Sequence, residues 1–268
     1  MKNEIITGEI VMHKCKMFIG EACHFTYNPN IGLKHNKIKF LDTITEKFDN
    51  PDTIFCYGDK VKNLLDKLEY FMNPFTLYSG NSDENIVYNE TYLNLANSNK
   101  IIKWYAQNLG FSHSKIKLLP IGLSNSQYPH GNLEAFTNIM NNLPDKINDI
   151  YFHFTINTNP EKRNKCYEQL CNNIPFLNQV SAIDNWQRLA TYKFCICPEG
   201  NGFDSHRIWE CIYLKVVPIV LKNEFVEILK IQYDIPLVIL EDWNDLKKIN
   251  LSYNDYKFEY SNFHIFMY

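Results

Sequence analysis

The sequence predicts an α/β protein built on mostly parallel sheets. Short apolar runs of strand length recur along the chain, and helical stretches lie between many of them. Continuous apolar strands that alternate with helices are typical of parallel sheets covered on both faces. The 268 residues are 45 % apolar and 15 % aromatic, so the chain can bury a large core.

The expected strands are the apolar runs themselves, and each is bounded by polar or turn-forming residues. In chain order they are TIFCY (53–57), FTLYS (75–79), IKLLPIG (116–122), YFHFTIN (151–157), FCIC (194–197), VVPIVL (216–221) and IPLVIL (235–240).

The expected helices lie between or beside these strands. They are VKNLLDKLEYFM (61–72), KIIKWYAQNLG (100–110, with Gly110 as its C-cap), NPEKRNKCYEQLCNN (159–173), NWQRLATY (185–192), SHRIWECIYL (205–214) and NEFVEILKIQ (223–232).

A polar stretch with Pro, Gly and one short helix interrupts this alternation of strands and helices in the middle of the chain. We therefore expect a Rossmann-like domain at 1–125, a linker at 126–149 and a second Rossmann-like domain at 150–268. Ligands of such sheets bind beyond the carboxyl ends of the strands, and a cleft between two sheets is a natural pocket.

Composition argues against several classes of protein. A net charge of −3 offers no basic field for nucleic acid, although a small anionic ligand is compatible with it. No apolar run is long enough to cross a bilayer, and acidic residues interrupt the amino-terminal stretch where a signal peptide would be apolar. The eight cysteines include no C-x-x-C pair, so reduced core thiols are expected rather than disulfides or zinc ligands.

Two strand ends in the second half carry polar residues suited to a phosphate. After YFHFTIN, Asn159 or Thr158 can cap a helix that has Pro160 at its first position and Arg163 in its first turns. A helix amino terminus with an arginine nearby can hold a phosphate. The alternative is that Arg163 is an ordinary solvated helix residue.

The second strand end is CPEGNGFDSHRIWE (197–210). Its glycines, Gly200 and Gly202, permit positive φ or a close approach of the backbone to a ligand. Asp204 or Ser205 can cap the following helix.

On that helix Arg207 and Glu210 share one face. The planar arginine suits a diphosphate, and the carboxylate suits the two hydroxyls of a ribose. The alternative is an ordinary Arg/Glu helical pair.

The stretch FCICPEGNGFDSHRIWECIYLKVVPIVL resembles the nucleotide-binding signature of exostosin-like glycosyltransferases. In that signature a strand leads to C-P-x-G, then to R-x-x-E on a helix, then to a strand of the V-P-I-V type. The segments FTLYSGNSDENI, KWYAQN, LPIGL and FTINTNPEKR are similar to parts of small bacterial and viral members. The resemblance implies a GT-B-like fold of two facing Rossmann-like domains and transfer of a sugar, with inversion, to a glycan or other hydroxyl acceptor.

The resemblance also implies roles for individual residues. It assigns Arg207 to the donor diphosphate, Glu210 to the ribose and Arg163 to a second diphosphate contact. Residues expected near the donor sugar or phosphates are Glu199, Gly200, Gly202, Asp204 and Ser205. The role of His206 stays open.

The expected donor is a UDP-sugar, with a GDP-sugar as the alternative, and no tightly bound cofactor is expected. The chain lacks a D-x-D motif, so we expect catalysis without a bound metal, with the helix terminus and arginines neutralising the leaving diphosphate. The expected location is the cytoplasm, or the host cytoplasm for a viral protein.

The acceptor side should come from the first half, where GNSDENI (80–86) follows a strand. An inverting transfer needs a base for the acceptor hydroxyl. Asp83 is the first candidate and Glu84 the second, with His24 and Glu21 in reserve. The alternative is that this segment only forms a turn and caps the next helix.

Two other function classes stay open. One is a nucleotide-sugar or glycan-binding protein that has lost turnover. The other is a different nucleotide-dependent enzyme, although neither G-x-x-x-x-G-K-[ST] nor G-x-G-x-x-G occurs. Within glycosyl transfer, a fucosyltransferase-like enzyme is the nearest alternative.

Overall fold

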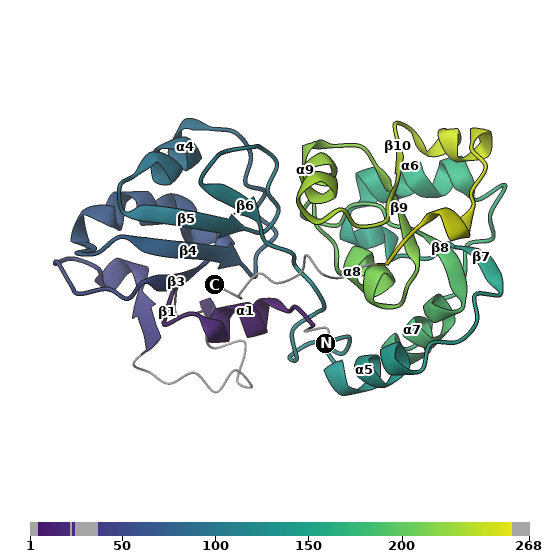
Figure 1. The fold of residues 1–268 in the computed structure, drawn as a ribbon, viewed down its shortest axis with the longest axis horizontal. Helices are drawn as coiled ribbons and strands as arrows, with labels where there is room; N and C mark the ends of the chain where they lie inside the picture. Colours follow the sequence, from purple (N-terminus) through teal and green to yellow (C-terminus); the bar gives the residue numbers. More distant parts are fainter. Residues whose placement is uncertain (1–4, 22, 25–36, 259–268) are drawn as a thin grey trace. The chain divides into compact units, whose positions relative to one another are not determined.

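The chain folds as an α/β protein with two parallel sheets (Figure 1). The computed structural model describes residues 5–21, 23–24 and 37–258. It divides into two compact units, one from Ile5 to Gln127 and the other beginning at Tyr128. Every pair of neighbouring strands in the two described sheets is parallel, which confirms the predicted α/β class with mostly parallel sheets and is compatible with Rossmann-like domains. Over these ranges, no helix has both the length and the apolar character needed to span a bilayer.

The first unit holds a six-stranded sheet in the order β2-β1-β3-β4-β5-β6. Its strands are β1 (Met17–Gly20), β2 (Ile38–Phe40), β3 (Thr53–Tyr57), β4 (Phe75–Gly80), β5 (Ile101–Ala106) and β6 (Ile116–Leu118). Because β1 lies between β2 and β3, the chain adds strands first on one side of β1 and then on the other. In parallel sheets, a reversal of this kind generally leaves a crevice at the carboxyl ends of the two adjacent strands where the direction changes, here β1 and β3.

Short helices precede or connect these strands. They are α1 (Gly8–Lys14), α3 (Val61–Leu64) and α4 (Glu90–Asn97), with 3-10 turns η3 (Leu41–Thr43), η4 (Gly58–Lys60) and η5 (Leu65–Tyr70). The side chains of Thr7 and Asn89 accept hydrogen bonds from the first turns of α1 and α4, so each helix begins at a polar cap. The helix expected at 61–72 is present as α3, followed by η5.

The prediction of a helix at 100–110 is wrong, because residues 101–106 of this segment form β5. Ile101 and Ala106 are buried between β4 and β6, and the Trp104 indole donates to Ser79 Oγ of β4 at 2.8 Å. Two adjacent isoleucines and two aromatic residues favour extended backbone. Gly110 is not a helix cap, since its N–H donates to the carbonyl of Ile86.

The second unit holds a four-stranded sheet in the order β10-β9-β8-β7. Its strands are β7 (Asn148–Tyr151), β8 (Tyr192–Ile196), β9 (Val217–Leu221) and β10 (Val238–Leu240). The helices are α5 (Leu133–Asn141), α6 (Pro160–Leu170), α7 (Ala182–Ala190), α8 (His206–Tyr213) and α9 (Glu224–Tyr233). The 3-10 turns are η6 (Ile156–Thr158), η7 (Trp243–Lys248) and η8 (Tyr253–Asp255).

The core of this unit has two faces because side chains alternate along each strand. On one face, Phe194 and Ile196 of β8 pack with Leu170 of α6 and with Trp243 of η7. The other face of the sheet is covered by α7 and α8, which contact β8 and β9.

Residues 126–149, expected to be a linker, lie mostly within the second unit. They contain α5, whose fully buried Phe136 packs edge-on against Trp186 of α7 at 5.1 Å between ring centroids. The short helix expected within this segment is α5, and it belongs to the second unit. The strand expected at 151–157 begins earlier, at Asn148, and the chain leaves the sheet after Tyr151.

Candidate ligand-binding site

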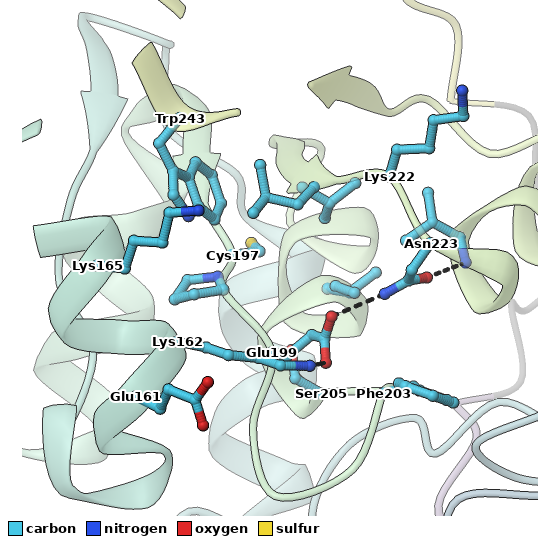
Figure 2. Close-up of a pocket in the computed structure, with 15 residues that line it drawn as sticks. Glu161, Lys162, Lys165, Cys197, Glu199, Phe203, Ser205, Lys222, Asn223 and Trp243 are labelled. Atoms are coloured by element: carbon cyan, nitrogen blue, oxygen red, sulfur yellow. Dashed lines mark hydrogen bonds and ion pairs between the residues drawn. The ribbon is translucent and has the colours of Figure 1, made fainter. Parts of the chain in front are cut away.

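A pocket of about 270 Å³ lies at the carboxyl ends of β8 and β9 in the second unit (Figure 2). Its walls come from the loop after β8, the residues that follow β9 and the first turns of α6, α8 and α9. This edge of a parallel sheet is where ligands bind in α/β proteins, since several helices begin there with their positive ends toward the ligand.

The charged side chains of the lining are three lysines and two glutamates, a formal balance of +1. They are Lys162, Lys165, Lys222, Glu161 and Glu199. The apolar part of the wall includes Phe203, Val226 and Trp243.

The three lysines are held by carboxylates. Lys162 pairs with Glu199, Lys165 lies 3.5 Å from Asp242, and Lys222 lies 2.7 Å from Glu241. The lysine side chains are 45 to 60 % exposed. Exposed pairs of this kind are weak, so an anionic ligand can compete for the ammonium groups.

Glu199 connects two walls of the pocket. Figure 2 shows its carboxylate between Lys162 on α6 and Asn223 at the start of α9. The Asn223 amide donates to Glu199 Oε1 at 2.8 Å. Glu199 is therefore a predicted site residue that does line the pocket.

Ser205 is the second predicted site residue in the lining, and it is the N-cap of α8. An N-cap serine normally accepts a hydrogen bond from the first turn of its helix, but Ser205 makes no such bond. Its Oγ is buried without a hydrogen-bond partner, and the residue is only 9 % exposed. An unpaired buried hydroxyl costs about 1–3 kcal/mol, so a ligand oxygen at this point would be stabilised.

Arg163 fixes the loop after β8 rather than lining the pocket. Its Nε donates to the Glu199 carbonyl at 2.9 Å, and its Nη1 donates to the Thr155 carbonyl at 2.7 Å. The Asn159 amide, whose oxygen caps α6 as predicted, donates to the Gly200 carbonyl at 2.7 Å. Burial, together with the nearby charge of Arg207, lowers the pKa of Arg163 to about 10.

Gly200 and Gly202 are buried, and neither has positive φ, so the close approach of the backbone to a ligand is the alternative that stays a prediction. Among the described glycines, Gly122 alone has positive φ. A Cβ on Gly200 would lie 3.6 Å from Arg163 Nη2, which is an ordinary contact. The loop therefore turns with conformations open to other residues.

Arg207 and Glu210 contact each other and the protein. Arg207 donates from Nε to Glu210 Oε2 and from Nη1 to the His153 carbonyl, both at 2.9 Å. The other oxygen of Glu210 accepts from the Trp186 indole at 2.9 Å. The pair thus ties α8 to α7 and to the segment after β7, and its roles toward diphosphate and ribose stay predictions.

Asp204 also has a structural contact. It is 3 % exposed, and its Oδ1 accepts from the Trp209 indole at 2.8 Å, which fixes the entry into α8.

The candidate bases lie in the first unit, after β4. Asp83 is exposed, whereas Glu84 Oε1 accepts from Lys62 Nζ at 2.6 Å and from the Tyr92 hydroxyl at 3.2 Å. Glu84 N–H donates to Ser82 Oγ, so part of this segment is the turn that was considered as the alternative.

The reserve candidates lie where the strand order reverses, after β1 and β3. His24 stacks on Tyr57 at 4.2 Å between ring centroids, and its Nε2 lies 3.3 Å from Asp59 Oδ2. Its Nδ1 accepts from the Glu21 N–H at 2.9 Å, so the nitrogen that a base would use is occupied. The Glu21 carboxylate pairs with Lys60 at 2.9 Å.

Several lining residues were missed from the sequence: Lys162, Lys165, Lys222, Asn223, Phe203 and Trp243. A signal for two of them was present, because Lys222 and Asn223 directly follow the strand VVPIVL and so must lie at its carboxyl end.

No protein-family model and no curated protein matches this chain. The resemblance to exostosin-like glycosyltransferases therefore stays a prediction.

Proposed function

We propose that this chain is a glycosyltransferase that binds the nucleoside diphosphate of its sugar donor in the pocket at the carboxyl ends of β8 and β9. In this proposal the two units are the two domains of a GT-B-like enzyme. The donor is a UDP-sugar, and the acceptor is a glycan or another hydroxyl compound. The stretch that resembles the nucleotide-binding signature, 194–221, supplies much of this pocket.

The observation that carries the proposal is the buried hydroxyl of Ser205, which has no partner at the amino terminus of α8. A phosphate oxygen can accept from this hydroxyl and interact with the positive end of the helix dipole. The neighbouring Lys162 and Lys222 supply charge for a diphosphate, and during transfer they would stabilise the leaving phosphate.

The apolar part of the pocket suits the nucleoside. Phe203 and Trp243 offer aromatic surface. The Asn223 amide donates to Glu199 and accepts from the Val226 N–H, and each of these groups can make one further hydrogen bond. The volume of about 270 Å³ lies just below the usual range for small-molecule sites, roughly 300–1,000 Å³. In this proposal part of the nucleotide fills the pocket, and the sugar extends outside it.

Asp83 is the proposed base for the acceptor hydroxyl, because its exposed carboxylate lies close after the carboxyl end of β4. Asp83→Asn should leave donor affinity unchanged and lower turnover by about 10²–10⁴. Normal turnover in this variant would exclude Asp83 as the base.

The test of binding is calorimetry on the full chain with UDP, GDP and the uncharged nucleosides. Lys222→Ala removes one charge-assisted contact, so diphosphate affinity should fall roughly 10-fold or more while nucleoside affinity changes little. Lys230→Ala is the matched control, since Lys230 has a similar exposure on α9 but lies outside the lining.

Turnover separates an enzyme from a binding protein. Incubation with the donor should release sugar to water slowly, and an intact donor despite tight binding would indicate a protein that binds without catalysis. Tighter binding of GDP than of UDP would favour the fucosyltransferase-like alternative. No binding of any nucleoside diphosphate would contradict the proposal.

A further inference from the structure

Three buried cysteines of the second unit converge between β8 and α8. The Sγ atoms of Cys195, Cys197 and Cys211 all lie within 4.8 Å of one another, and those of Cys197 and Cys211 are 3.9 Å apart. Each of the three residues is 3 % exposed or less.

The sequence pattern explains this convergence. Residues two apart on a strand point to the same face of the sheet, so Cys195 and Cys197 share a face. That face is opposite to the one on which Phe194 and Ile196 pack with α6. It is the face that α8 covers, and α8 brings Cys211 to the other two thiols. The C-x-C pair is therefore a ligand pattern that a search for C-x-x-C spacing does not detect.

The spacing of the sulfurs matches that of metal ligands. Thiolate–zinc bonds are about 2.3 Å long, so three sulfurs arranged around one such ion lie about 4 Å apart. The Sγ atoms of Cys197 and Cys211 are 3.9 Å apart and so already lie at this distance. The other two pairs of Sγ atoms lie within 4.8 Å, and small side-chain movements would bring them to about 4 Å.

We propose that Cys195, Cys197 and Cys211 form a site for one thiophilic d10 cation, Cu(I) or Zn(II), bound by three thiolates. On binding, each thiol releases one proton to solvent and forms one metal–sulfur bond, with no change in oxidation state. Soft thiolate ligands select these two ions from the common divalent and monovalent cations. The proposal replaces the expectation that the chain binds no metal, and it does not depend on the proposed transfer reaction.

Cys197 lines the pocket, which provides an entry path for the ion. A bound cation would clamp the loop after β8 to α8 and so fix one wall of the pocket.

The test is a titration of the reduced full chain with Cu(I) without oxygen, and separately with Zn(II), each against a chromophoric chelator. We expect one ion per chain. Cys195→Ser, Cys197→Ser and Cys211→Ser should each weaken binding by more than about 100-fold, the upper limit for loss of an outer-shell partner. Cys171→Ser is the matched control, because Cys171 is a partly exposed cysteine at the end of α6 outside the cluster, and it should bind like the wild type.

X-ray absorption on the loaded wild-type protein provides a readout that does not depend on variants that fold. Three sulfur neighbours at about 2.3 Å are expected. Tight binding of Cu(I) but not Zn(II) would identify a three-coordinate copper site, and the reverse would identify zinc with an additional outside ligand. The proposal is wrong if neither ion binds, if nitrogen or oxygen ligands predominate, or if Cys171→Ser weakens binding as much as the cluster variants.

Discussion

Arg207 and Glu210 form hydrogen bonds to each other and to other residues of the chain, so substituting either should lower the free energy of unfolding. Glu210 is buried with a side chain 9 % exposed, and Arg207→Ala would leave its carboxylate without a cation. Removing one partner of a buried pair costs about 3–5 kcal/mol, and because the Arg207 side chain is 21 % exposed we expect roughly 2–3 kcal/mol. Urea unfolding measures this loss.

The matched control is Lys248→Ala, which breaks another i,i+3 pair. Lys248 lies 2.7 Å from Asp245 with a side chain 74 % exposed, so its loss should change the free energy of unfolding little. Equal small effects in both variants would show that Arg207 and Glu210 are only a surface pair.

His153 should make stability depend on pH. Burial, followed by the charges of Arg207 and Arg188, lowers the pKa of His153 in the folded chain, and its Nδ1 is buried without a partner. Below about pH 6.5, the ordinary value, the unfolded chain binds a proton that the folded chain does not. Stability should therefore fall as the pH drops from 6.5 toward the lowered pKa.

His153→Phe keeps a ring beside Phe176 and removes the titrating group. The loss of unfolding free energy between pH 7.5 and 5.5 should be smaller in this variant than in the wild type. An equal loss in both proteins would show that other groups control the acid response.

At the scale of elements, two glycines should respond differently to alanine. Gly122 follows β6 with φ +66°, and an added Cβ would lie 2.0 Å from the Ile6 carbonyl oxygen. The left-handed backbone alone costs about 1–2 kcal/mol, and this clash adds to it, so Gly122→Ala should destabilise by at least that amount. Gly200→Ala meets only ordinary contacts and should change stability little. Thermal unfolding of the two variants compares them, and similar losses would contradict the backbone geometry.

The sequence predicted strands correctly where the apolar pattern of a segment matches its burial in the folded chain. The strand cores around Thr53–Tyr57, Phe75–Gly80 and Val217–Leu221 are rich in apolar and aromatic residues, and each forms a largely buried parallel strand. The segment 100–110 was misassigned because apolar residues three and four apart also fit a helix, and only pairing with β4 and β6 decides for a strand. The three-residue β2 gave no detectable pattern of its own.

The site was predicted in part for a similar reason. The family resemblance pointed to Glu199 and the helix-cap pattern to Ser205, and both line the candidate pocket. Neither could show that Arg163 and Arg207 donate to main-chain carbonyls, because those acceptors lie 8 to 54 residues away in the sequence. The same limit applies to Trp243, which reaches the pocket from the turn that follows β10.

For the whole molecule, the two compact units should unfold in distinguishable steps. Each has its own parallel sheet and its own buried residues, such as Phe55 and Trp104 in the first and Phe194 and Ile219 in the second. Multidomain chains of this kind commonly depart from two-state unfolding. Scanning calorimetry should show two transitions, and UDP at 100 times its dissociation constant should stabilise the second unit by about 2.7 kcal/mol. One transition that shifts as a whole would show that the units unfold together.

The most direct test of the central claim is hydrogen–deuterium exchange of the full chain with and without UDP, read by mass spectrometry. The claim is that the pocket at the carboxyl ends of β8 and β9 binds a nucleoside diphosphate. Exchange should slow in peptides that cover 197–208 and 220–226, while uridine without phosphates should protect the first of these less. Unchanged exchange in both segments at saturating UDP, or protection confined to peptides of the first unit, would contradict the account.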